Sequence, residues 1–357
     1  MTPLDDLPLP KRAQPRADAS LVIDCHGHFG APAADALLAA RPERAAEMGA
    51  MALASGPASH RRNAEVVLPA AGERMASLEK RLRDLDDMGC DMQVVSPSPH
   101  LYAYWADAVL ADELVACVNE AGLALAARQP KRLIPLALVG LQHPEQAARQ
   151  LRKAMAAGMR GAEISASVGP HELSDRRFDP FWAEAEALSA VIFIHPLGSS
   201  LGQRLDRYYL SNIVAQPTET TIGLAHLIMG GVLDRFPKLR ILGAHGGGYL
   251  PAYIGRCDHG WSVRPEAREC ALPPSHYLAR IWVDTVVFDA AQLRNLVARM
   301  GADRIAWGTD YPFDMGDYHP DITAGWLDPA QRAAVMGRTA LELFGLTAKS
   351  TLQGSRS

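Results

Sequence analysis

The segment Leu21-Val22-Ile23-Asp24-Cys25-His26-Gly27-His28 begins with an apolar run and ends with two histidines one residue apart. Residues i and i+2 of a strand point to the same side, so the imidazoles of His26 and His28 can converge on one metal ion. A mononuclear metal site needs further nitrogen or oxygen ligands and an open position. The segment therefore predicts a strand that carries part of a metal site, for which the rest of the chain must supply the other ligands.

Short apolar runs alternate along the chain with longer Ala-, Leu- and Arg-rich stretches of helical period, such as residues 144–157 and 180–189. Repeated strand-helix units of this kind indicate either a (β/α)8 barrel or a doubly wound open sheet. The eight expected strands are residues 21–26, 92–96, 133–138, 160–165, 191–195, 240–245, 281–285 and 305–310.

The positions of the polar side chains favour the barrel. His26, His195, His245 and Asp310 each fall at the carboxyl end of an expected strand, and His28 lies just beyond the first one. A barrel gathers these ends around one mouth, whereas an open sheet spreads them along an edge. We therefore predict an α/β fold, a (β/α)8 TIM barrel with an insertion after strand 1.

The barrel domain is expected to span residues 20–348. Residues 29–80 are too many for a strand-to-helix loop and are expected to form an insertion over the mouth. Residues 1–19, with four prolines and mixed charge, are expected to form an N-terminal arm, and residues 349–357 a polar tail.

Composition excludes several classes of function. The chain has 357 residues, of which 48% are hydrophobic, and a net charge of −4 without a basic stripe, which argues against a nucleic-acid partner. No segment approaches the roughly 20 apolar residues of a membrane span, and acidic residues and prolines occupy the position of a signal peptide's apolar core. Five scattered cysteines without a CxxC spacing argue against a disulfide framework. We expect a cytoplasmic protein without membrane attachment.

Two further residues complete a ligand set. His195 ends the apolar run 191–194 before Pro196, and Asp310 ends the run 305–309. A buried imidazole or carboxylate at such a place requires a cation or a hydrogen-bond partner. Together, His26, His28, His195 and Asp310 form a set of three histidines and one carboxylate, which suits one divalent metal. Zn²⁺ is favoured, and Mn²⁺ or Fe²⁺ is compatible with the same residue types.

His245 is followed by three glycines, which allow the backbone to approach the pocket closely. With four ligands already on the metal, His245 is expected to act as a general acid or base on a metal-bound water. The alternatives are a fifth ligand or a packed core residue.

These motifs together resemble the amidohydrolase superfamily, and within it the branch of aminocarboxymuconate semialdehyde decarboxylase. The resemblance runs from about residue 20 to about residue 345 and is strongest over residues 217–239 and the His245 glycine segment, continuing to Arg256. The motifs that carry it are Asp24-Cys25-His26-Gly27-His28, Ile194-His195-Pro196, Ala244-His245-Gly246-Gly247-Gly248, Gly308-Thr309-Asp310-Tyr311-Pro312 and Pro217-Thr218-Glu219-Thr220-Thr221.

The resemblance implies a (β/α)8 barrel with one divalent metal, usually zinc, on the residues matching His26, His28, His195 and Asp310. It also implies that the residue matching His245 activates a water. The arginine matching Arg256 would reach into a neighbouring subunit's pocket and grip a substrate carboxylate, which implies a homodimer or a dimer of dimers.

Two departures from the branch leave the substrate open. The namesake enzyme follows its His-Pro with Trp-Asp, whereas Leu197-Gly198 follows here, and its substrate-binding arginine in the insertion falls on Pro69 in this chain. Arg61, Arg62 or Arg74 could replace that arginine.

The resemblance also favours one metal over two. Binuclear amidohydrolases place a carboxylated lysine after strand four, whereas residues 160–165 contain no lysine. Glu163 in that strand either accepts a hydrogen bond behind the metal site or faces a helix.

The expected function is metal-dependent nonoxidative decarboxylation of a small hydroxylated aromatic, heteroaromatic or ring-opened dienoic carboxylic acid. His245 or Asp310 would handle the proton at the carbon that loses CO₂. The alternatives are a metal-dependent hydrolase or hydratase of an aromatic ring-cleavage product, and a noncatalytic barrel that binds metal or small acids.

Overall fold

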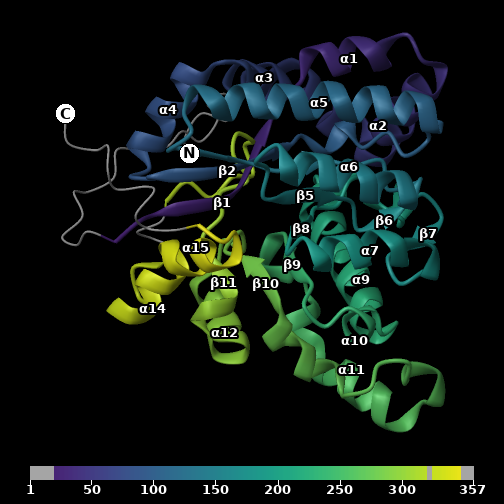
Figure 1. Cartoon of the computed structure of the whole chain (residues 1–357), viewed down its shortest axis with the longest axis vertical. Helices are drawn as coiled ribbons and strands as arrows, with labels where there is room; N and C mark the ends of the chain where they lie inside the picture. The colour runs from purple at the N-terminus through teal and green to yellow at the C-terminus, as the bar shows by residue number, and fades with distance from the viewer. Residues whose placement is uncertain (1–19, 320–323, 347–357) are drawn as a thin grey trace.

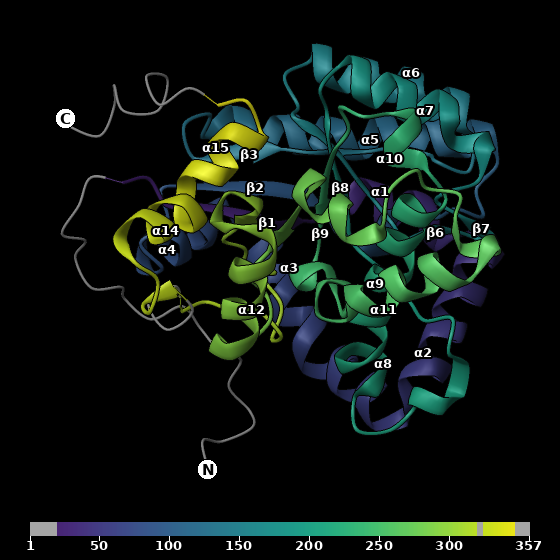
Figure 2. The same ribbon diagram turned by 90° about the horizontal axis from the view of Figure 1, so that it is seen from below.

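The strands form one closed parallel barrel whose order follows the chain (Figures 1 and 2). The computed structural model describes residues 20–319 and 324–346. One run of paired strands is β1-β2-β3 and the other is β4-β5-β8-β9-β10-β11. The N–H of Leu136, between β3 and β4, donates to the Val95 carbonyl, so these two short strands act as one. The strands are β1 (Ile23–Phe29), β2 (Met92–Pro97), β3 (Leu133–Pro135), β4 (Ala137–Leu138), β5 (Gly161–Ile164), β8 (Val191–Ile194), β9 (Arg240–Gly243), β10 (Ile281–Asp284) and β11 (Ile305–Ala306).

Closure of the barrel joins its first and last strands. The N–H of Cys25 donates to the Trp307 carbonyl at 2.8 Å, and Gly27 forms a parallel bridge with Tyr311. Each expected strand overlaps an observed one, and the predicted (β/α)8 barrel is confirmed. A small excursion, β6 (Ser167–Val168) with β7 (His171–Glu172), forms a separate antiparallel pair.

The first strand is longer than predicted. It continues to Phe29, so His28 lies inside β1 rather than just beyond it. The pairing of β1 with β2 shifts register between Asp24 and Gly27, and this irregularity lets the strand continue along β2 as far as Pro97.

Each barrel strand is followed by at least one helix on the outside of the barrel (Figures 1 and 2). The helices expected at residues 144–157 and 180–189 are present as α6 and α7. In α6 the buried residues Ala147, Leu151 and Ala154 lie on one face, and Pro144 occupies the first turn, where a missing N–H costs nothing. The outer helices are α4 (Leu78–Asp87), α5 (Ala108–Arg128), α6 (Pro144–Ala156), α7 (Asp179–Ala187), α8 (Leu210–Ile213), α9 (Ala215–Met229), α10 (Val232–Arg235), α11 (Leu250–Val263), α12 (Ala290–Met300), α14 (Pro329–Ala333) and α15 (Thr339–Leu343).

The segment between β1 and α4 is mostly helical. It forms α1 (Pro32–Ala39), α2 (Pro42–Arg62) and α3 (Leu68–Ala76), with a π-helical segment at Asn63–Val67. Helix α2 kinks at Gly56, whose φ is 75°, and a Cβ there would lie 1.8 Å from the Asp206 carbonyl oxygen. This close approach seats α2 against Gly202–Leu205 and α8, both of which follow β8 (Figure 2).

An inner apolar cluster fills the barrel below the strand ends. Val191 and Phe193 of β8 belong to it, and His195 continues the same side two residues later. The Phe193 ring packs edge-on against the His26 ring with 4.8 Å between centroids. The polar residues at the strand ends therefore rest on an apolar floor.

The two terminal segments predicted from the sequence, residues 1–19 and 349–357, lie outside the described residues. Within the part that is described, no helix combines the length and apolar character needed to cross a membrane.

Candidate metal centre

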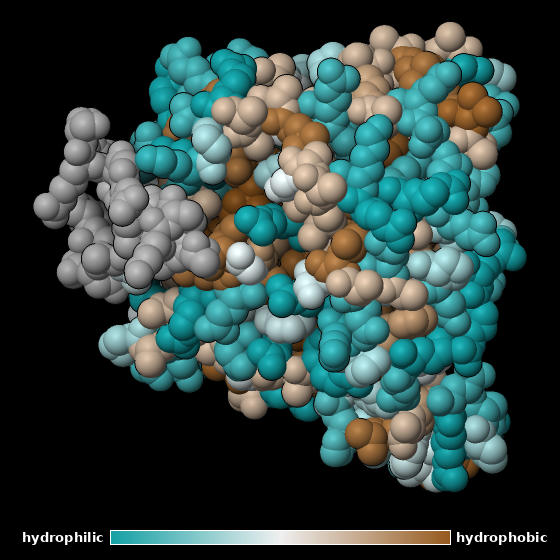
Figure 3. All heavy atoms as spheres, in the orientation of Figure 1, coloured by the Kyte–Doolittle hydropathy of each residue, from teal (hydrophilic) through white to brown (hydrophobic). Residues whose placement is uncertain are grey.

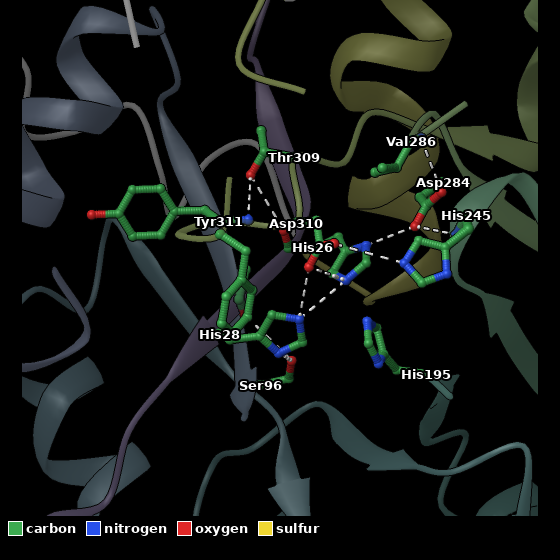
Figure 4. Close-up of polar contacts among 12 residues, drawn as sticks. His26, His28, Ser96, His195, His245, Asp284, Val286, Thr309, Asp310 and Tyr311 are labelled. Carbon is green, nitrogen blue, oxygen red and sulfur yellow. Dashed lines mark hydrogen bonds and ion pairs between the residues drawn. The ribbon is translucent and has the colours of Figure 1, made fainter. Parts of the chain in front are cut away.

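Four predicted ligands converge at the carboxyl ends of the strands (Figure 4). The Nε2 atoms of His26 and His28 lie 3.2 Å apart, and each lies close to Asp310 Oδ1, at 3.4 and 3.2 Å respectively. One ligand atom from each of His26, His28, His195 and Asp310 lies within 4.8 Å of the other three. Residues from three segments that are far apart in the sequence thus lie in one cluster.

The cluster suits a divalent cation. The Nε2 atom of His195 and the Oδ1 atom of Asp310 are buried and accept no hydrogen bond from the described residues. Buried polar atoms without a partner are costly, and a bound cation would satisfy both. Three imidazole nitrogens and one carboxylate oxygen are a donor set that proteins use for one divalent transition metal.

Each histidine of the cluster is held from behind through its Nδ1 atom. His26 Nδ1 lies 2.7 Å from Asp284 Oδ2, and His195 Nδ1 lies 2.9 Å from the Pro196 carbonyl oxygen. His28 Nδ1 lies 3.3 Å from Ser96 Oγ and 3.4 Å from the Pro97 carbonyl oxygen. An Nδ1 proton donated to such acceptors leaves the Nε2 lone pair free for a metal.

The protonation states also suit metal binding. Burial opposes the charge on Asp310, but the positive charge of His26 and the nearby rings of His245 and His28 outweigh it and hold the pKa of Asp310 well below its ordinary value. Burial and the neighbouring histidines hold the pKa of His195 well below its usual range. Burial also opposes the charged form of His26, but Asp310 and Asp284 raise its pKa to about 9. Asp310 is therefore ionised and His195 neutral, whereas His26 must lose a proton before it binds a metal.

Asp284 joins the cluster to the loop that carries His245. Its fully buried carboxylate accepts His26 Nδ1 and the His245 N–H at Oδ2, and the N–H groups of Gly246 and Val286 at Oδ1. Asp284 was not predicted from the sequence: it lies next to last in the expected strand 281–285, although it ends the observed strand β10.

His245 faces the cluster without belonging to the group of four (Figure 4). Its Nε2 lies 3.7 Å from Asp310 Oδ2, and its ring centroid lies 5.0 Å from that of His195. Its Nδ1 atom is buried and has no hydrogen-bond partner among the described residues. This arrangement leaves the ring available for proton transfer beside the cluster.

Glu163 is buried inside the barrel and does not face a helix. Its Oε1 accepts the Tyr102 hydroxyl at 2.6 Å, while its Oε2 lies 3.6 Å from His28 Nδ1. The same Tyr102 hydroxyl lies 3.0 Å from the His195 carbonyl oxygen. Of the two alternatives left open by the sequence, the position behind the cluster is the one observed.

A second buried network fixes the backbone around the two histidines of β1. Arg81 is fully buried and donates to the His28 carbonyl and to Gln93 Oε1, both at 2.6 Å. Gln93 in turn donates to Asp24 at 2.7 Å, and Asp24 accepts the His26 N–H at 3.0 Å. Asp24 thus supports the strand and is not one of the clustered donors.

The arginines lie outside the cluster. Arg256 is exposed on α11, and no ion pair or hydrogen bond joins it to the cluster within the described residues. Arg61 is exposed, and Arg74 pairs with Asp84 at 3.2 Å.

Arg62 differs from the other insertion arginines. Burial raises the pKa of Asp314, and Arg62 partly offsets this rise. Burial, together with Asp314 and Asp310, also raises the pKa of Tyr209, which Arg62 again opposes. Arg62 therefore lies near two side chains that sense the charge of Asp310.

Known proteins resemble this chain in sequence and in fold. The sequence model described as amidohydrolase matches residues 23–346. The chain is 34% identical over 272 residues to 2-amino-3-carboxymuconate-6-semialdehyde decarboxylase of Dictyostelium discoideum, covering 74% of this chain and 76% of that protein. It is 28% identical over 291 residues to the protein of the same name in Caenorhabditis elegans, covering 67% and 73%.

Among solved structures, 5-carboxyvanillate decarboxylase of Novosphingobium aromaticivorans, complexed with manganese and 4-hydroxy-3-methoxy-5-nitrobenzoic acid, superposes with a TM-score of 0.80. The identity is 22%, and the match covers 95% of this chain and 99% of that one. This likeness concerns the fold.

Proposed function

This chain belongs to the amidohydrolase family, and we propose that it is a metal-dependent nonoxidative decarboxylase. Its substrate would be a small hydroxylated aromatic, heteroaromatic or ring-opened dienoic carboxylic acid. The observation that carries the proposal is the buried group of His26, His28, His195 and Asp310. Within it, His195 Nε2 and Asp310 Oδ1 have no hydrogen-bond partner among the described residues, and His245 lies beside the group. The names of the relatives, which decarboxylate a muconate semialdehyde, support the same reaction class.

One divalent metal on these four residues is part of the proposal. Zn²⁺ is favoured because it takes histidine nitrogens and a carboxylate oxygen as ligands and can expand to five ligands, which leaves a position for a substrate oxygen. Mn²⁺ is the alternative, since a structural neighbour was solved with manganese and the residue types accept it. When bound, the cation supplies Lewis-acid polarisation of a substrate oxygen next to the carboxylate that leaves.

His245 is the residue that we propose for proton transfer. Loss of CO₂ breaks a carbon–carbon bond and leaves the electron pair on the substrate carbon, which a proton must then occupy. His245 Nε2, 3.7 Å from Asp310 Oδ2, would deliver that proton, and Asp310 is the alternative donor. The buried floor beneath the cluster, which includes Phe193, keeps water away from the lower side of the site.

Arg256 is proposed to reach into the pocket of a second copy of the chain and to bind the carboxylate of the substrate there. It lies on the exposed side of α11, which projects from the body of the molecule (Figure 1). Tyr249, Tyr253 and Val263 share that side at helical spacing and are 42%, 68% and 55% exposed. Apolar residues are visible among polar ones at this projecting end (Figure 3). These features support a homodimer or a dimer of dimers.

Mixed dimers test whether Arg256 acts across the interface. An Arg256→Ala chain and a His245→Asn chain should each be nearly inactive alone. After mixing, the sites that combine an intact His245 with the partner's intact Arg256 should restore about a quarter of the wild-type activity. No recovery despite exchange of subunits would place Arg256 in its own site or outside any site.

Arg62 is proposed as the insertion residue that contacts the substrate, because it lies near Asp314 and Tyr209. The helices α1–α3, which hold Arg62, are accordingly proposed to cover the barrel mouth. The cytoplasm is the proposed location, since all five cysteines are free thiols, as is usual in reducing compartments.

The decisive experiment is a panel of hydroxybenzoates, hydroxypicolinates and muconate semialdehydes, assayed for CO₂ with zinc or manganese supplied. Release of CO₂, with solvent deuterium at the carbon that lost it, supports the proposal. Incorporation of labelled water without CO₂ release would identify a hydrolase or hydratase, and metal binding without turnover would identify a binding protein. His195→Ala should abolish metal binding, whereas His100→Ala, at a histidine bound to Ser98 and Asp35, should not.

A further inference from the structure

The motif Pro217-Thr218-Glu219-Thr220-Thr221 contributes no atom to the metal cluster, yet it lies in the first turns of α9 beside two mouth loops. One of these loops follows His195. Glu219 is buried, and its Oε1 accepts both the N–H and the hydroxyl of Ser200, at 2.5 and 2.6 Å. The loop that begins at His195 is therefore held by Glu219 at Ser200, five residues after the histidine.

The second loop carries His245 and is held by Thr221. The Tyr249 N–H donates to Thr221 Oγ1 at 2.8 Å, and the Thr221 hydroxyl donates to the Pro217 carbonyl at 2.6 Å. A Cβ on Gly248 would lie 2.1 Å from the Pro217 carbonyl oxygen and 2.6 Å from Thr221 Oγ1. The backbone of this loop is thus in direct contact with the first turn of α9.

The His245 loop needs such support because its backbone conformation is unfavourable. Four consecutive residues, His245 to Gly248, have φ between 55° and 72°. Glycine adopts this region readily, but a histidine does so only when its surroundings hold it there. Asp284 holds the start of the loop through the His245 and Gly246 N–H groups, and Thr221 holds its end.

We propose that Thr221 and Glu219 are positioning residues, which fix the His245 and His195 loops relative to each other through one helix. The inference rests on the proposed function, because it assigns proton transfer to His245 and metal binding to His195. Neither residue belongs to the metal cluster. The loss of one anchor should therefore act on the rate and on metal affinity rather than on the shape of the substrate pocket.

The test compares two threonines of the same motif. Thr218 donates to the Val214 carbonyl at 2.7 Å, as Thr221 donates to that of Pro217, but no loop N–H donates to Thr218 in the described structure. Thr221→Val should lower kcat at least about tenfold with KM and bound metal within about twofold of wild type, because small displacements of catalytic groups are costly. Thr221→Ser should recover most of the rate, and Thr218→Val should retain it.

Hydrogen–deuterium exchange of the peptide around residues 243–252 gives a readout that does not depend on turnover. Thr221→Val should accelerate exchange there, and Thr218→Val should not. Glu219→Leu should weaken metal binding at least about tenfold, whereas Glu219→Gln keeps an acceptor for Ser200 and should bind metal nearly as wild type does. If the valine variants do not fold, Thr221→Ala and Thr218→Ala carry the same comparison.

Equal kcat and equal loop exchange in the Thr221 and Thr218 variants would overturn the role of Thr221. Unchanged metal affinity in Glu219→Leu would overturn that of Glu219. If the wild-type protein releases no CO₂ from any acid of the panel, the proposed function fails. The exchange and metal-affinity measurements would still decide whether α9 positions the two loops.

Discussion

Replacing Asp284 by asparagine should weaken metal binding although Asp284 is not a ligand. Its carboxylate accepts four hydrogens, from His26 Nδ1 and the N–H groups of His245, Gly246 and Val286, at 2.7 to 3.1 Å. An asparagine has one acceptor oxygen and one donor nitrogen in place of two acceptors. Each of its two orientations therefore satisfies a different pair of these donors.

In one orientation the amide oxygen faces Gly246 and Val286, and the amide nitrogen faces His26. His26 can then move its proton to Nε2 and accept at Nδ1, so only the His245 N–H loses its partner. In the opposite orientation two backbone N–H groups, those of Gly246 and Val286, are unpaired. The metal-free variant should adopt the first orientation. His26 then carries its proton on Nε2, the atom whose lone pair a metal would need.

Metal binding requires the opposite orientation of the amide. That orientation leaves one more buried N–H unpaired, at a cost of about 1–3 kcal/mol. The dissociation constant should rise by about 5- to 150-fold, since about 1.4 kcal/mol corresponds to tenfold. Competition with a chelating dye measures it directly. The matched control is Asp289→Asn, an exposed cap of α12 whose side chain accepts the Ala291 N–H and for which asparagine is an equal cap. An affinity of Asp284→Asn within about threefold of the control would refute the reasoning about the His26 proton.

Three more outcomes follow from the same contacts. His245→Asn should lower kcat by about 10²- to 10⁴-fold while one metal stays bound per chain, as kinetics and metal analysis would show. The pKa of His26 in the metal-free protein is raised from 6.5 to about 9, so its stabilising effect is fully present below pH 6.5 and is lost as the pH rises through about 9. Metal affinity should change in the opposite direction, rising about tenfold per pH unit across that window and levelling off above it, in titrations at fixed ionic strength. Arg81→Met should destabilise the protein by about 3–5 kcal/mol in urea unfolding, because it leaves buried acceptors, including the His28 carbonyl, without their charged donor.

The residues at strand ends were predictable because the pattern that marks a buried strand also marks where it stops. His195 follows the buried run 191–194, and Asp310 follows the run 305–309. In a barrel these stops meet at one mouth, so a one-dimensional pattern locates a three-dimensional site. His245 was found in the same way, with its glycines as an additional signal.

Asp284 and Arg81 were not predicted from such a pattern. Asp284 is a single carboxylate at a strand end, and its partners His26 and His245 lie 258 and 39 residues away. Arg81 is one of several charged residues on α4, and only the tertiary structure buries it against His28. Residues that orient ligands have no preferred spacing to the ligands, so they are read from contacts and not from the sequence.

In the insertion, by contrast, local sequence signals were present but did not distinguish helices from loops. Residues 29–80 contain prolines and glycines that are usual in loops, but Pro32, Pro42 and Pro69 all stand in the first turns of helices. Proline is well tolerated there because the first helical N–H groups have no intrahelical acceptor. Gly56, the kink of α2, is explained only by its contact with the Asp206 carbonyl.

Closure of the barrel and assembly of the metal site depend on the same hydrogen bonds. The N–H of Asp310 donates to the His26 carbonyl at 2.8 Å, and the N–H of His28 donates to the Tyr311 carbonyl at 2.7 Å. These bonds pair the first strand with the segment after the last one, and they bring Asp310 beside the two histidines from the other end of the chain. A chain whose barrel is open can therefore hold at most an incomplete ligand set. Because a ligand that binds only the folded state stabilises it, a metal on these four residues would favour the closed barrel over every open form.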